Sequence, residues 1–527
     1  MSWRRLPLFG LLLLVGCSAG PDVRRIVLFH TSDVHGAVSA TPARWNKADP
    51  KRRIGGYPAL ASLVDSETLP HAVLDSGDIF QGTPEGNLTR GKVIIAAMNA
   101  VGYSAMAIGN HEFDYGEGVL RDLIEQAEFP VLAANIVRRS DGKHVSYAQP
   151  TTMVTVGGVR IGIVGLATQH TATSTLPANV AHLRFESEVE AAREHAARLR
   201  TEGADVVIAL THCGLLPSKA RTIVNAADVV LTKRDLAYVG DLTIARGAPV
   251  DVVMGGHTHT GIDGTWRDEQ SGVYIIQSHE SLKATSRVEL AVDVAEDRDV
   301  AANRLISLES RLVYLWPDEV GEKHEVTTVI RGYSDAIAGQ LNQIVGTLAD
   351  DRMKRTGTLD HPLGSWMADT MRAAAGADIG IQNTFGVRAD LYQGPVKMAD
   401  LYRVMPFDNT LVTVTLPGSA VLELLRDNLK TSPARVQVSG LTVSFSRGAD
   451  GTVGRVEVSV GGEALVDSRL YTLATNNYMA SGGSGGRALG GFPQLDSGEG
   501  LRELFVEALG LGSPLTAPGV GRIRVLE

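Results

Sequence analysis

The sequence Ile108-Gly109-Asn110-His111-Glu112-Phe113-Asp114-Tyr115-Gly116 joins two different patterns. Residues 105–108 are apolar, and residues 119–124 repeat their apolar positions with the period of a helix. This order is typical of a buried strand that runs into a helix, and α/β sheets hold their chemistry at such strand ends. We therefore expect an α/β fold in which Asn110 and His111 lie at the exposed end of a strand.

Asn110 and His111 suit metal binding and proton transfer. Adjacent residues that leave a strand point to different sides, so the Asn110 amide oxygen could reach a metal ion while His111 faces a substrate. Asp114, three residues after His111, could fix the tautomer of its ring and favour its charged form. Taken alone, an Asn-His-Glu sequence is as typical of a surface loop, and other parts of the chain decide between the two.

The same pattern of an apolar run followed by polar residues recurs in the first half of the chain. Expected strands occupy 25–31, 72–74, 159–166, 206–210 and 250–254. Helical patterns separate them at 59–64, 92–98 and 186–200. This alternation predicts a layered α/β domain. Because four of the strands end in Asp or His, those side chains should converge on one edge.

Seven residues at the strand ends have the chemistry of metal ligands: Asp33, His35, Asp78, Asn110, His212, His257 and His259. Two pairs of them are spaced i, i+2, which puts both side chains on one side of an extended strand end. If Asp78 bridges two ions, the seven supply four ligands to each. Mixed imidazole and oxygen ligands suit Zn, Mn or Fe better than Mg or Ca. Any one histidine alone is more often an ordinary core or surface residue, but seven candidates at successive strand ends favour a metal site.

The N-terminus has the composition of an export signal, with two arginines before an apolar run at 6–15. Such a run is too short to span a bilayer comfortably and is typical of a secretory signal. The sequence Leu14-Val15-Gly16-Cys17 also resembles the bacterial lipobox, in which the cysteine becomes the lipidated N-terminus. We expect an exported protein that lipid chains on Cys17 anchor to the periplasmic side of a bacterial membrane. An ordinary signal peptide with an incidental cysteine is the alternative.

Length and composition limit the remaining possibilities. A chain of 527 residues is long for one core, so two domains are expected. The net charge of −9 is not gathered in blocks, and a nucleic acid polymer is not expected as a partner. Cys213 is the only other cysteine, so no intramolecular disulfide is expected after lipidation. The expected division is a signal peptide at 1–16, a first domain at 17–325, a helical linker at 326–348 and a second domain at 349–527.

The strand-end motifs resemble those of the calcineurin-like metallophosphoesterases: Asp33-x-His35, Gly77-Asp78, Gly109-Asn110-His111-Glu112, Thr211-His212 and Gly256-His257-Thr258-His259. More closely, residues 74–84 (Leu-Asp-Ser-Gly-Asp-Ile-Phe-Gln-Gly-Thr-Pro) and residues 110–116 resemble the bacterial periplasmic 5′-nucleotidases. The likeness covers almost the whole mature chain. It implies a four-layer α/β/β/α first domain, a helical linker and an α+β substrate-binding second domain.

The resemblance also implies how the ligands are divided between two divalent metal ions. The first ion would correspond to Asp33, His35, Asp78 and His259, and the second to Asp78, Asn110, His212 and His257. Some relatives carry Gln where His259 stands. Two cations about 3.5–4 Å apart lower the pKa of a bridging water, and the resulting hydroxide would attack phosphorus in line. His111, protonated with help from Asp114, would neutralise the developing charge or protonate the leaving group.

Three motifs of the second half resemble substrate-binding loops of the same family: Asn383-Thr384-Phe385-Gly386-Val387-Arg388, Met405-Pro406-Phe407-Asp408-Asn409-Thr410-Leu411 and Thr475-Asn476-Asn477-Tyr478-Met479-Ala480-Ser481-Gly482-Gly483. The resemblance implies that Phe407 and Tyr478 sandwich a nucleobase and that Arg388 reaches a phosphate. Asn383 is a further candidate in the first motif. For each aromatic residue, packing in the core is the alternative.

The second half departs from the family pattern in three places. Two glycines of the first motif are Thr384 and Phe385, and Ser484 stands where an Asp often grips the ribose. Residues 359–361, Leu-Asp-His, stand where some relatives have an arginine. Ser484 is therefore the candidate ribose contact, and the identity of the substrate is less constrained than the reaction.

The resemblance implies an enzyme of the 5′-nucleotidase type that releases phosphate from nucleotides or related phosphate esters. Alternatives are a 2′,3′-cyclic nucleotide or sugar-nucleotide (UDP-sugar) phosphoesterase, or a relative of the thiosulfohydrolases. A binding lipoprotein that has lost activity is a further alternative, although every ligand position is filled.

Overall fold

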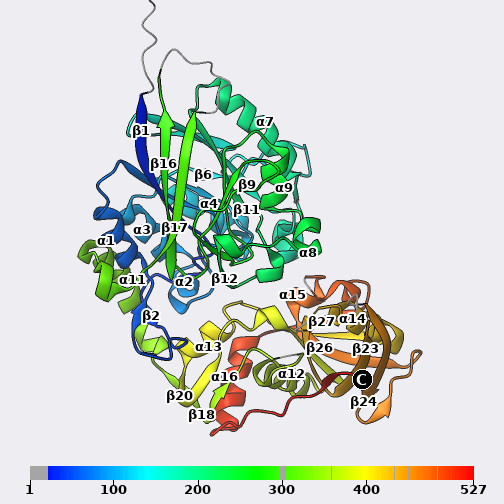
Figure 1. The fold of residues 1–527 in the computed structure, drawn as a ribbon. Coiled ribbons are helices and arrows are strands. Elements are labelled where there is room, and N and C mark those ends of the chain that lie inside the picture. Colours follow the sequence, from blue (N-terminus) through cyan, green and yellow to red (C-terminus); the bar gives the residue numbers. More distant parts are fainter. Residues whose placement is uncertain are drawn as a thin grey trace, which may run out of the picture.

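The computed structural model describes residues 22–295, 304–357, 359–431, 434–448, 452–483 and 485–526. The chain forms two domains, the first above the second in Figure 1. Both combine helices and sheets, so the predicted α/β class is confirmed. None of the helices in the described part of the chain combines the length and the hydropathy that a membrane span requires.

The first domain contains two large sheets. The first has the order β17 (Leu305–Tyr314), β16 (Ala284–Asp293), β1 (Val23–Thr31), β4 (His71–Asp75), β5 (Ala105–Ala107) and β6 (Val131–Leu132). The second has the order β15 (Tyr274–Gln277), β13 (Val252–Gly255), β11 (Val206–His212), β9 (Val159–Ala167) and β8 (Thr151–Val156). The neighbouring strands from β1 to β6 and from β9 to β15 are parallel, so their carboxyl ends share an edge in each sheet.

The two sheets pack face to face, and the alternation of side chains along each strand builds the layers. Ile26 and Leu28 of β1 lie in the core between the sheets, whereas Val27 and Phe29 face the opposite side. On that side lie α1 (Tyr57–Asp65), α3 (Lys92–Val101) and α4 (Gly116–Gln126). Strand β11 divides its residues in the same way, and α7 (Glu188–Thr201) and α9 (Asp241–Gly247) cover the second sheet. The four-layer α/β/β/α arrangement is thus confirmed.

The second domain is built around one five-stranded sheet. Its order is β22 (Val436–Ser439), β19 (Ile379–Asn383), β26 (Leu470–Asn476), β21 (Thr410–Pro417) and β27 (Gln494–Gly500). Helices α12 (Pro362–Ala375) and α16 (Leu501–Leu511) belong to the core on one face, and α14 (Gly418–Asn428) to the core on the other. Strands β23 (Leu441–Arg447), β24 (Val453–Val460), β25 (Glu463–Ala464) and β28 (Ile523–Val525) form a further sheet. Helices and mostly antiparallel strands make this an α+β domain.

The linker expected at 326–348 is only partly helical. Helix α11 (His324–Leu341) packs against α1 and α3 of the first domain through Val326 and Ile330. Strand β18 begins at Ile344 and pairs with β20 (Leu391–Lys397) in the second domain. The expectation of a helix over 344–348 is therefore wrong, because these residues gain a ladder of hydrogen bonds with β20.

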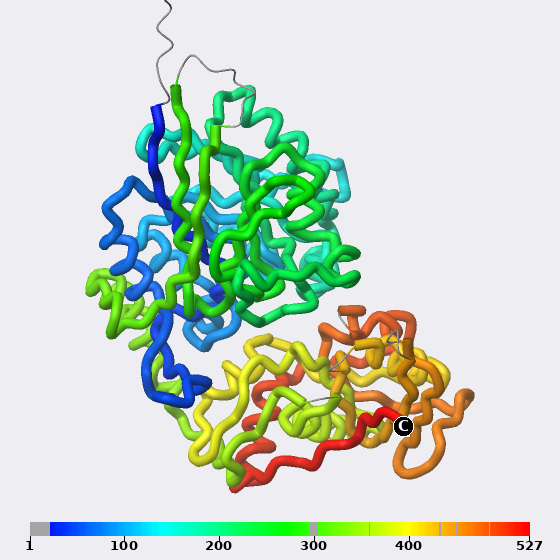
Figure 2. The backbone as a smooth tube through the Cα atoms, viewed as in Figure 1, coloured from blue at the N-terminus to red at the C-terminus, as the bar shows by residue number. Residues whose placement is uncertain are grey.

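Contacts of Arg44 and Asn87 also join the domains, in addition to the linker. The segment after β1, blue in Figure 2, extends towards the second domain, where the Arg44 guanidinium lies 4.1 Å from the centre of the Tyr392 ring. The buried Asn87 amide donates a hydrogen bond to the backbone oxygen of Pro406. Helix α13 (Met398–Val404) leads into this second contact.

Candidate metal and catalytic centre

The seven predicted ligands all follow strands of the two large sheets. Asp33 and His35 follow β1, Asp78 follows β4, Asn110 follows β5, His212 ends β11, and His257 and His259 follow β13. The carboxyl edges of both sheets meet at this point, so the ligands come from two sheets rather than one. Three short loops of the first sheet form one wall of the site, and the end of β11 with the loop after β13 forms the opposite wall.

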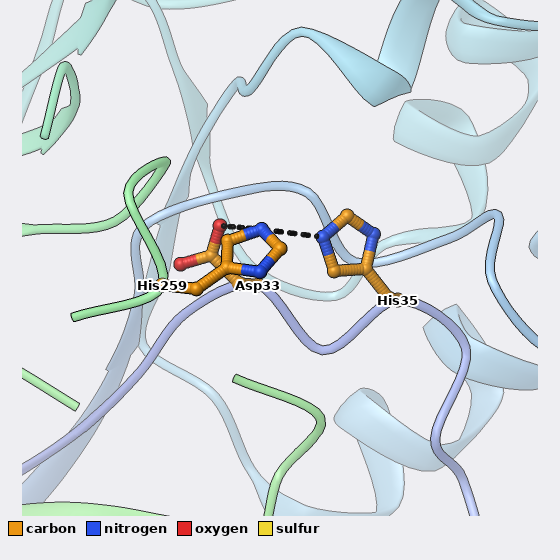
Figure 3. A group of neighbouring side chains, drawn as sticks. All are labelled: Asp33, His35 and His259. Carbon is orange, nitrogen blue, oxygen red and sulfur yellow. Dashed lines mark hydrogen bonds and ion pairs between the residues drawn. The ribbon is translucent and has the colours of Figure 1, made fainter. Parts of the chain in front are cut away.

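The first group of side chains consists of Asp33, His35 and His259, which point towards one another in Figure 3. His35 Nε2 lies 3.0 Å from His259 Nε2, and Asp33 Oδ1 lies 3.3 Å from His259 Nε2. All three residues are buried. A carboxylate and two imidazole nitrogens at this separation could hold one divalent cation.

The second group consists of Asp78, His212 and His257. Asp78 Oδ2 lies 2.9 Å from His212 Nε2. Asp78 also lies in a group with His35 and His111, so its carboxylate faces ligands of both groups. That position is the one a bridging carboxylate requires.

The ligand loops adopt an unusual backbone conformation. Five of the seven residues have positive φ angles: Asp33, His35, Asp78, His257 and His259. Non-glycine residues rarely adopt this region, and such strain is concentrated at functional sites. Neighbouring glycines make room for the ligands. A Cβ atom at Gly109 would lie 2.3 Å from Asp78 Oδ1, and one at Gly256 would lie 2.9 Å from Asp33 Oδ2.

Contacts outside the groups fix the orientation of the imidazole rings. His212 Nδ1 donates to the backbone oxygen of Ser76 at 2.7 Å, and His35 Nδ1 donates to that of Gln81 at 3.1 Å. His259 Nδ1 is held by the carboxylate of Glu280. A carbonyl oxygen can only accept, so Nδ1 carries a proton in the first two rings, and Nε2 has a free lone pair when the ring is neutral. Each ring thus offers Nε2 to the centre of its group.

The protonation of the histidines also suits metal binding. Burial lowers the pKa of His35 and of His257 well below the usual range, and lowers that of His259 to about 3. Neutral imidazole is the form that binds a metal. Burial alone would lower the pKa of His212, but the carboxylate of Asp78 raises it to about 10. In the absence of metal, a proton on His212 Nε2 therefore lies against Asp78, and a metal ion that binds this nitrogen would replace it.

Asn110 gives the clearest test of whether the site fits a metal ion. Its Nδ2 donates to the backbone oxygen of Ser174 at 3.3 Å, which directs its Oδ1 the other way. That Oδ1 is buried and has no hydrogen-bond partner among the described residues. An unpaired buried amide oxygen is costly, and coordination of a cation would remove the cost. The residues present fit two divalent ions.

His111 and Asp114 form a close pair beside the second group. His111 Nδ1 lies 2.5 Å from Asp114 Oδ2, and the His111 backbone N–H donates to Asp78 Oδ1 at 2.8 Å. Burial alone would lower the pKa of His111, but the carboxylates of Asp114 and Asp78 raise it. The pair therefore favours a protonated imidazole at the edge of the metal site.

A cavity of about 380 Å³ opens onto both groups and is lined by residues of both domains. Asn383, Arg388, Phe407 and Tyr478 of the second domain line it. The Phe407 ring is stacked on the His111 ring with 5.9 Å between centroids, and Arg388 Nη2 lies 3.3 Å from His35 Nε2. These four candidates therefore lie at the cavity, whereas Ser484 and Cys17 lie outside the described residues.

The sequence alone did not indicate three residues that the fold brings to the site. Glu280 holds His259, and it follows β15, whose apolar run and polar end repeat the pattern of the other strands. That signal could have revealed it. Arg221 lines the cavity and contacts Glu280 at 3.1 Å, and Thr175 contacts Asp114 at 2.7 Å. These two lie in segments without a periodic pattern, and only the fold brings them to the site.

Glu112, in the motif at residues 108–116, connects two loops of the site. Its buried carboxylate accepts hydrogen bonds from the backbone N–H groups of Asp78, Ile79 and Gly109, at 2.9, 2.9 and 2.6 Å. Burial raises its pKa to about 7. Glu112 thereby joins the loop after β4 to the loop after β5.

The fold and the site together define a metal-dependent phosphoesterase. Residues 26–261 match the calcineurin-like phosphoesterase family, and residues 339–491 match the 5′-nucleotidase C-terminal domain. The chain belongs to the calcineurin-like phosphoesterases that carry a 5′-nucleotidase C-terminal domain, which are hydrolases that use two divalent metal ions.

Known proteins resemble the chain over nearly its whole length. A 5′-nucleotidase of Vibrio vulnificus is 28% identical over 95% of this chain and 94% of its own. The structure of a 5′-nucleotidase precursor from Thermus thermophilus superposes with a TM-score of 0.80 and 27% identity, over 95% of this chain and 99% of its own. The sulfate thiohydrolase SoxB of Thermus thermophilus has the same fold, with a TM-score of 0.73 and 18% identity over 99% of this chain and 98% of its own.

Proposed function

We propose that this protein hydrolyses the phosphate ester of nucleotides, as a 5′-nucleotidase does. The observation that carries the proposal is the cavity itself, in which two groups of metal ligands from the first domain face Phe407, Tyr478 and Arg388 of the second. A nucleotide could use both the metal groups and the residues of the second domain. Its phosphate suits cations and a guanidinium, and its base suits aromatic rings.

The residues around the metal groups supply the steps of the reaction. Asp33, His35, Asp78 and His259 would hold one metal ion, and Asp78, Asn110, His212 and His257 the other. When bound, the two ions supply a water of lowered pKa and stabilise charge on the phosphoryl oxygens. Zn, Mn and Fe suit this mixed ligand set.

His111 and Arg388 act on the charge that develops at phosphorus. His111, held by Asp114 at 2.5 Å, donates its proton towards the leaving oxygen. Arg388 binds a non-bridging oxygen with its fork of N–H groups. Burial and nearby Arg221 lower the pKa of Arg388 to about 9, so an incoming anion relieves repulsion between the two guanidinium groups.

The second domain selects the substrate in this proposal. Phe407 and Tyr478 contact the base, and stacking on aromatic rings tolerates any base. Asn383 lies at the cavity with its amide oxygen already engaged by Asn476 at 2.9 Å, so its N–H groups are the ones it can offer a substrate. Ser484 is the proposed ribose contact.

Hydrolysis should be measured with Mn²⁺ and Zn²⁺ each added back. The readouts are phosphate release from nucleoside 5′-monophosphates and sugar phosphates, nucleoside monophosphate formed from 2′,3′-cyclic nucleotides, UMP formed from UDP-sugars, and sulfate release from a thiosulfate ester. We expect the nucleoside 5′-monophosphates to have the highest kcat/KM. A preference for cyclic nucleotides or UDP-sugars would replace the proposed substrate. No release from any phosphate ester would overturn the proposal.

We also propose that the protein is exported and held to the periplasmic side of a bacterial membrane by lipid on Cys17. The N-terminal arginines, the apolar run at 6–15 and the small residue before Cys17 support this. A periplasmic enzyme would meet nucleotides outside the cytoplasm.

A further inference from the structure

We propose that Thr175 is a positioning residue for the His111–Asp114 pair. The proposal deepens the proposed phosphate-ester hydrolysis and depends on it. Thr175 lies in a segment that contains α5 (Thr171–Ser174) and α6 (Pro177–Val180), between β9 and α7 in the chain.

The contacts form a chain of three side chains. Thr175 Oγ1 donates to Asp114 Oδ1 at 2.7 Å, and Asp114 Oδ2 lies 2.5 Å from His111 Nδ1. Thr175 lines the cavity but is only 1% exposed, so its hydroxyl is largely shielded from bulk water. A carboxylate can only accept, which fixes the direction of the Thr175 hydroxyl. Both oxygens of Asp114 are thus engaged, and the carboxylate cannot rotate without losing one of the bonds.

The backbone of the segment is fastened to the His111 loop on both sides of Thr175. The Asn179 amide donates to the backbone oxygens of Phe113 and Asp114 at 2.9 and 3.0 Å. On the other side, the Asn110 amide donates to the backbone oxygen of Ser174 at 3.3 Å. These bonds do not involve the Thr175 hydroxyl. Removal of the hydroxyl should therefore leave the segment in place.

Loss of the Thr175 hydroxyl should impair catalysis rather than binding. A hydrogen bond to a charged group is among the stronger ones, and without it Asp114 can turn away from His111. We expect Thr175→Val to lower kcat about 10-fold and to leave KM within about 2-fold. Thr175→Ser, which keeps the hydroxyl, should stay within about 3-fold of the wild-type kcat.

Thr171→Val is the matched control, since it makes the same change in the same segment. Thr171 is fully buried, and its Oγ1 has no hydrogen-bond partner among the described residues. It should leave kcat within about 2-fold. Thermal melting and metal content are measured for every variant. Thr175→Ala should change kcat and KM in the same way as Thr175→Val, and it replaces the valine variant if that one does not fold.

The decisive test is a double-mutant cycle with His111→Ala, measured on a nucleoside 5′-monophosphate. If Thr175 acts through Asp114 and His111, its loss should change kcat less than 2-fold in the His111→Ala background. Equal losses in both backgrounds, or a wild-type kcat for Thr175→Val and Thr175→Ala, would overturn the proposal. An inactive wild-type enzyme would instead refute the proposed function, so the two failures are distinguishable.

Discussion

At the scale of single residues, Asp78 has the central position. Its carboxylate lies 2.9 Å from His212 Nε2, and it belongs both to the group with His257 and to the group with His35. Asn110, by contrast, belongs to neither of these groups, and its only described side-chain hydrogen bond runs from Nδ2 to the backbone oxygen of Ser174. The two residues should therefore differ in what their loss does to the metal ions.

Asp78→Ala should abolish binding of both metal ions, because a bridging carboxylate serves each of them. Asn110→Ala should weaken mainly one ion, because the amide oxygen reaches a single site. Elemental analysis of metal per chain, after equilibration with Zn²⁺ or Mn²⁺, gives the measurement. Two tightly bound ions in the Asp78→Ala protein would show that Asp78 does not bridge.

The candidate ligands could be predicted from the sequence because each lies at the end of an apolar strand, and folding brings such strand ends together. Thr175 and Arg221 could not be predicted, because both lie outside helices and strands, in the segments 168–182 and 213–222. Positions in irregular segments are set by tertiary contacts alone. Here those contacts include the bond from Thr175 to Asp114 and the one from Arg221 to Glu280.

At the scale of elements, the departure at residues 359–361 has a structural explanation. His361 caps the N-terminus of α12, with its Nδ1 accepting from the backbone N–H of Gly364 at 3.0 Å. Asp360 accepts from the backbone N–H groups of Gly521 and Arg522 at 2.8 and 2.7 Å. The two residues fasten the start of α12 where some relatives have an arginine.

The His361 cap makes the stability of the second domain depend on pH. Burial lowers the pKa of His361 to about 4, against 6.5 in a free side chain. Above pH 6.5 the ring is neutral whether folded or unfolded, and its contribution is complete. Between pH 6.5 and about 4 only the unfolded chain takes up the proton, so the free energy of unfolding falls as the pH falls.

His361→Asn should remove this part of the pH dependence, because asparagine is a good N-cap that does not titrate. Urea unfolding at pH 8 and pH 5 measures the effect. We expect the variant to lose less stability between the two pH values, by about 1–2 kcal/mol. His361→Ala lacks the cap and should be less stable at pH 8. Identical pH dependence of the asparagine variant and the wild type would contradict this account of the cap.

The layered arrangement could be predicted only in part from the strands. Strands β1 and β11 are buried on both faces, so neither has a polar face that would assign it to one sheet or the other. The division into two sheets came from the family resemblance. Residues 344–348 were misassigned because their pattern does not distinguish a helix from an edge strand, and pairing with β20 decides between them.

At the scale of the whole molecule, the cavity exists only because the two domains meet. Phe407 comes directly after Pro406, whose backbone oxygen accepts a hydrogen bond from Asn87 of the first domain. The Phe407 ring is stacked on the His111 ring. The Tyr478 hydroxyl donates to the backbone oxygen of Thr173 in the first domain at 2.7 Å. The proposed substrate-binding residues and the candidate metal ligands thus face one cavity across the domain boundary.

Phe407→Ala should raise KM for nucleoside monophosphates about 10-fold or more, because base stacking contributes about 1–3 kcal/mol. The kcat/KM for glycerol phosphate, which has no base, should change less than about 3-fold. Phe407→Tyr keeps the ring and serves as the control. Equal losses with both substrates would show that Phe407 supports His111 rather than a base.

The proposed membrane anchor depends on Cys17. Cys17→Ala should release soluble protein, or leave an unprocessed precursor, because the acceptor of the lipid is missing. Labelling of cells with radioactive palmitate compares the variant with the wild type. Cys213→Ala is the control and should be labelled normally, since Cys213 is buried in the first domain. Equal labelling of the Cys17→Ala protein would exclude the anchor.

The central claim is that two metal ions in the first domain hydrolyse the phosphate ester of a nucleotide bound by the second. The most direct measurement is phosphate release from a nucleoside 5′-monophosphate as metal-stripped protein is titrated with Mn²⁺ or Zn²⁺. We predict no activity without metal and a plateau at two equivalents per chain. Full activity in the presence of a chelator, a plateau at one equivalent, or no phosphate release with two ions bound would contradict it.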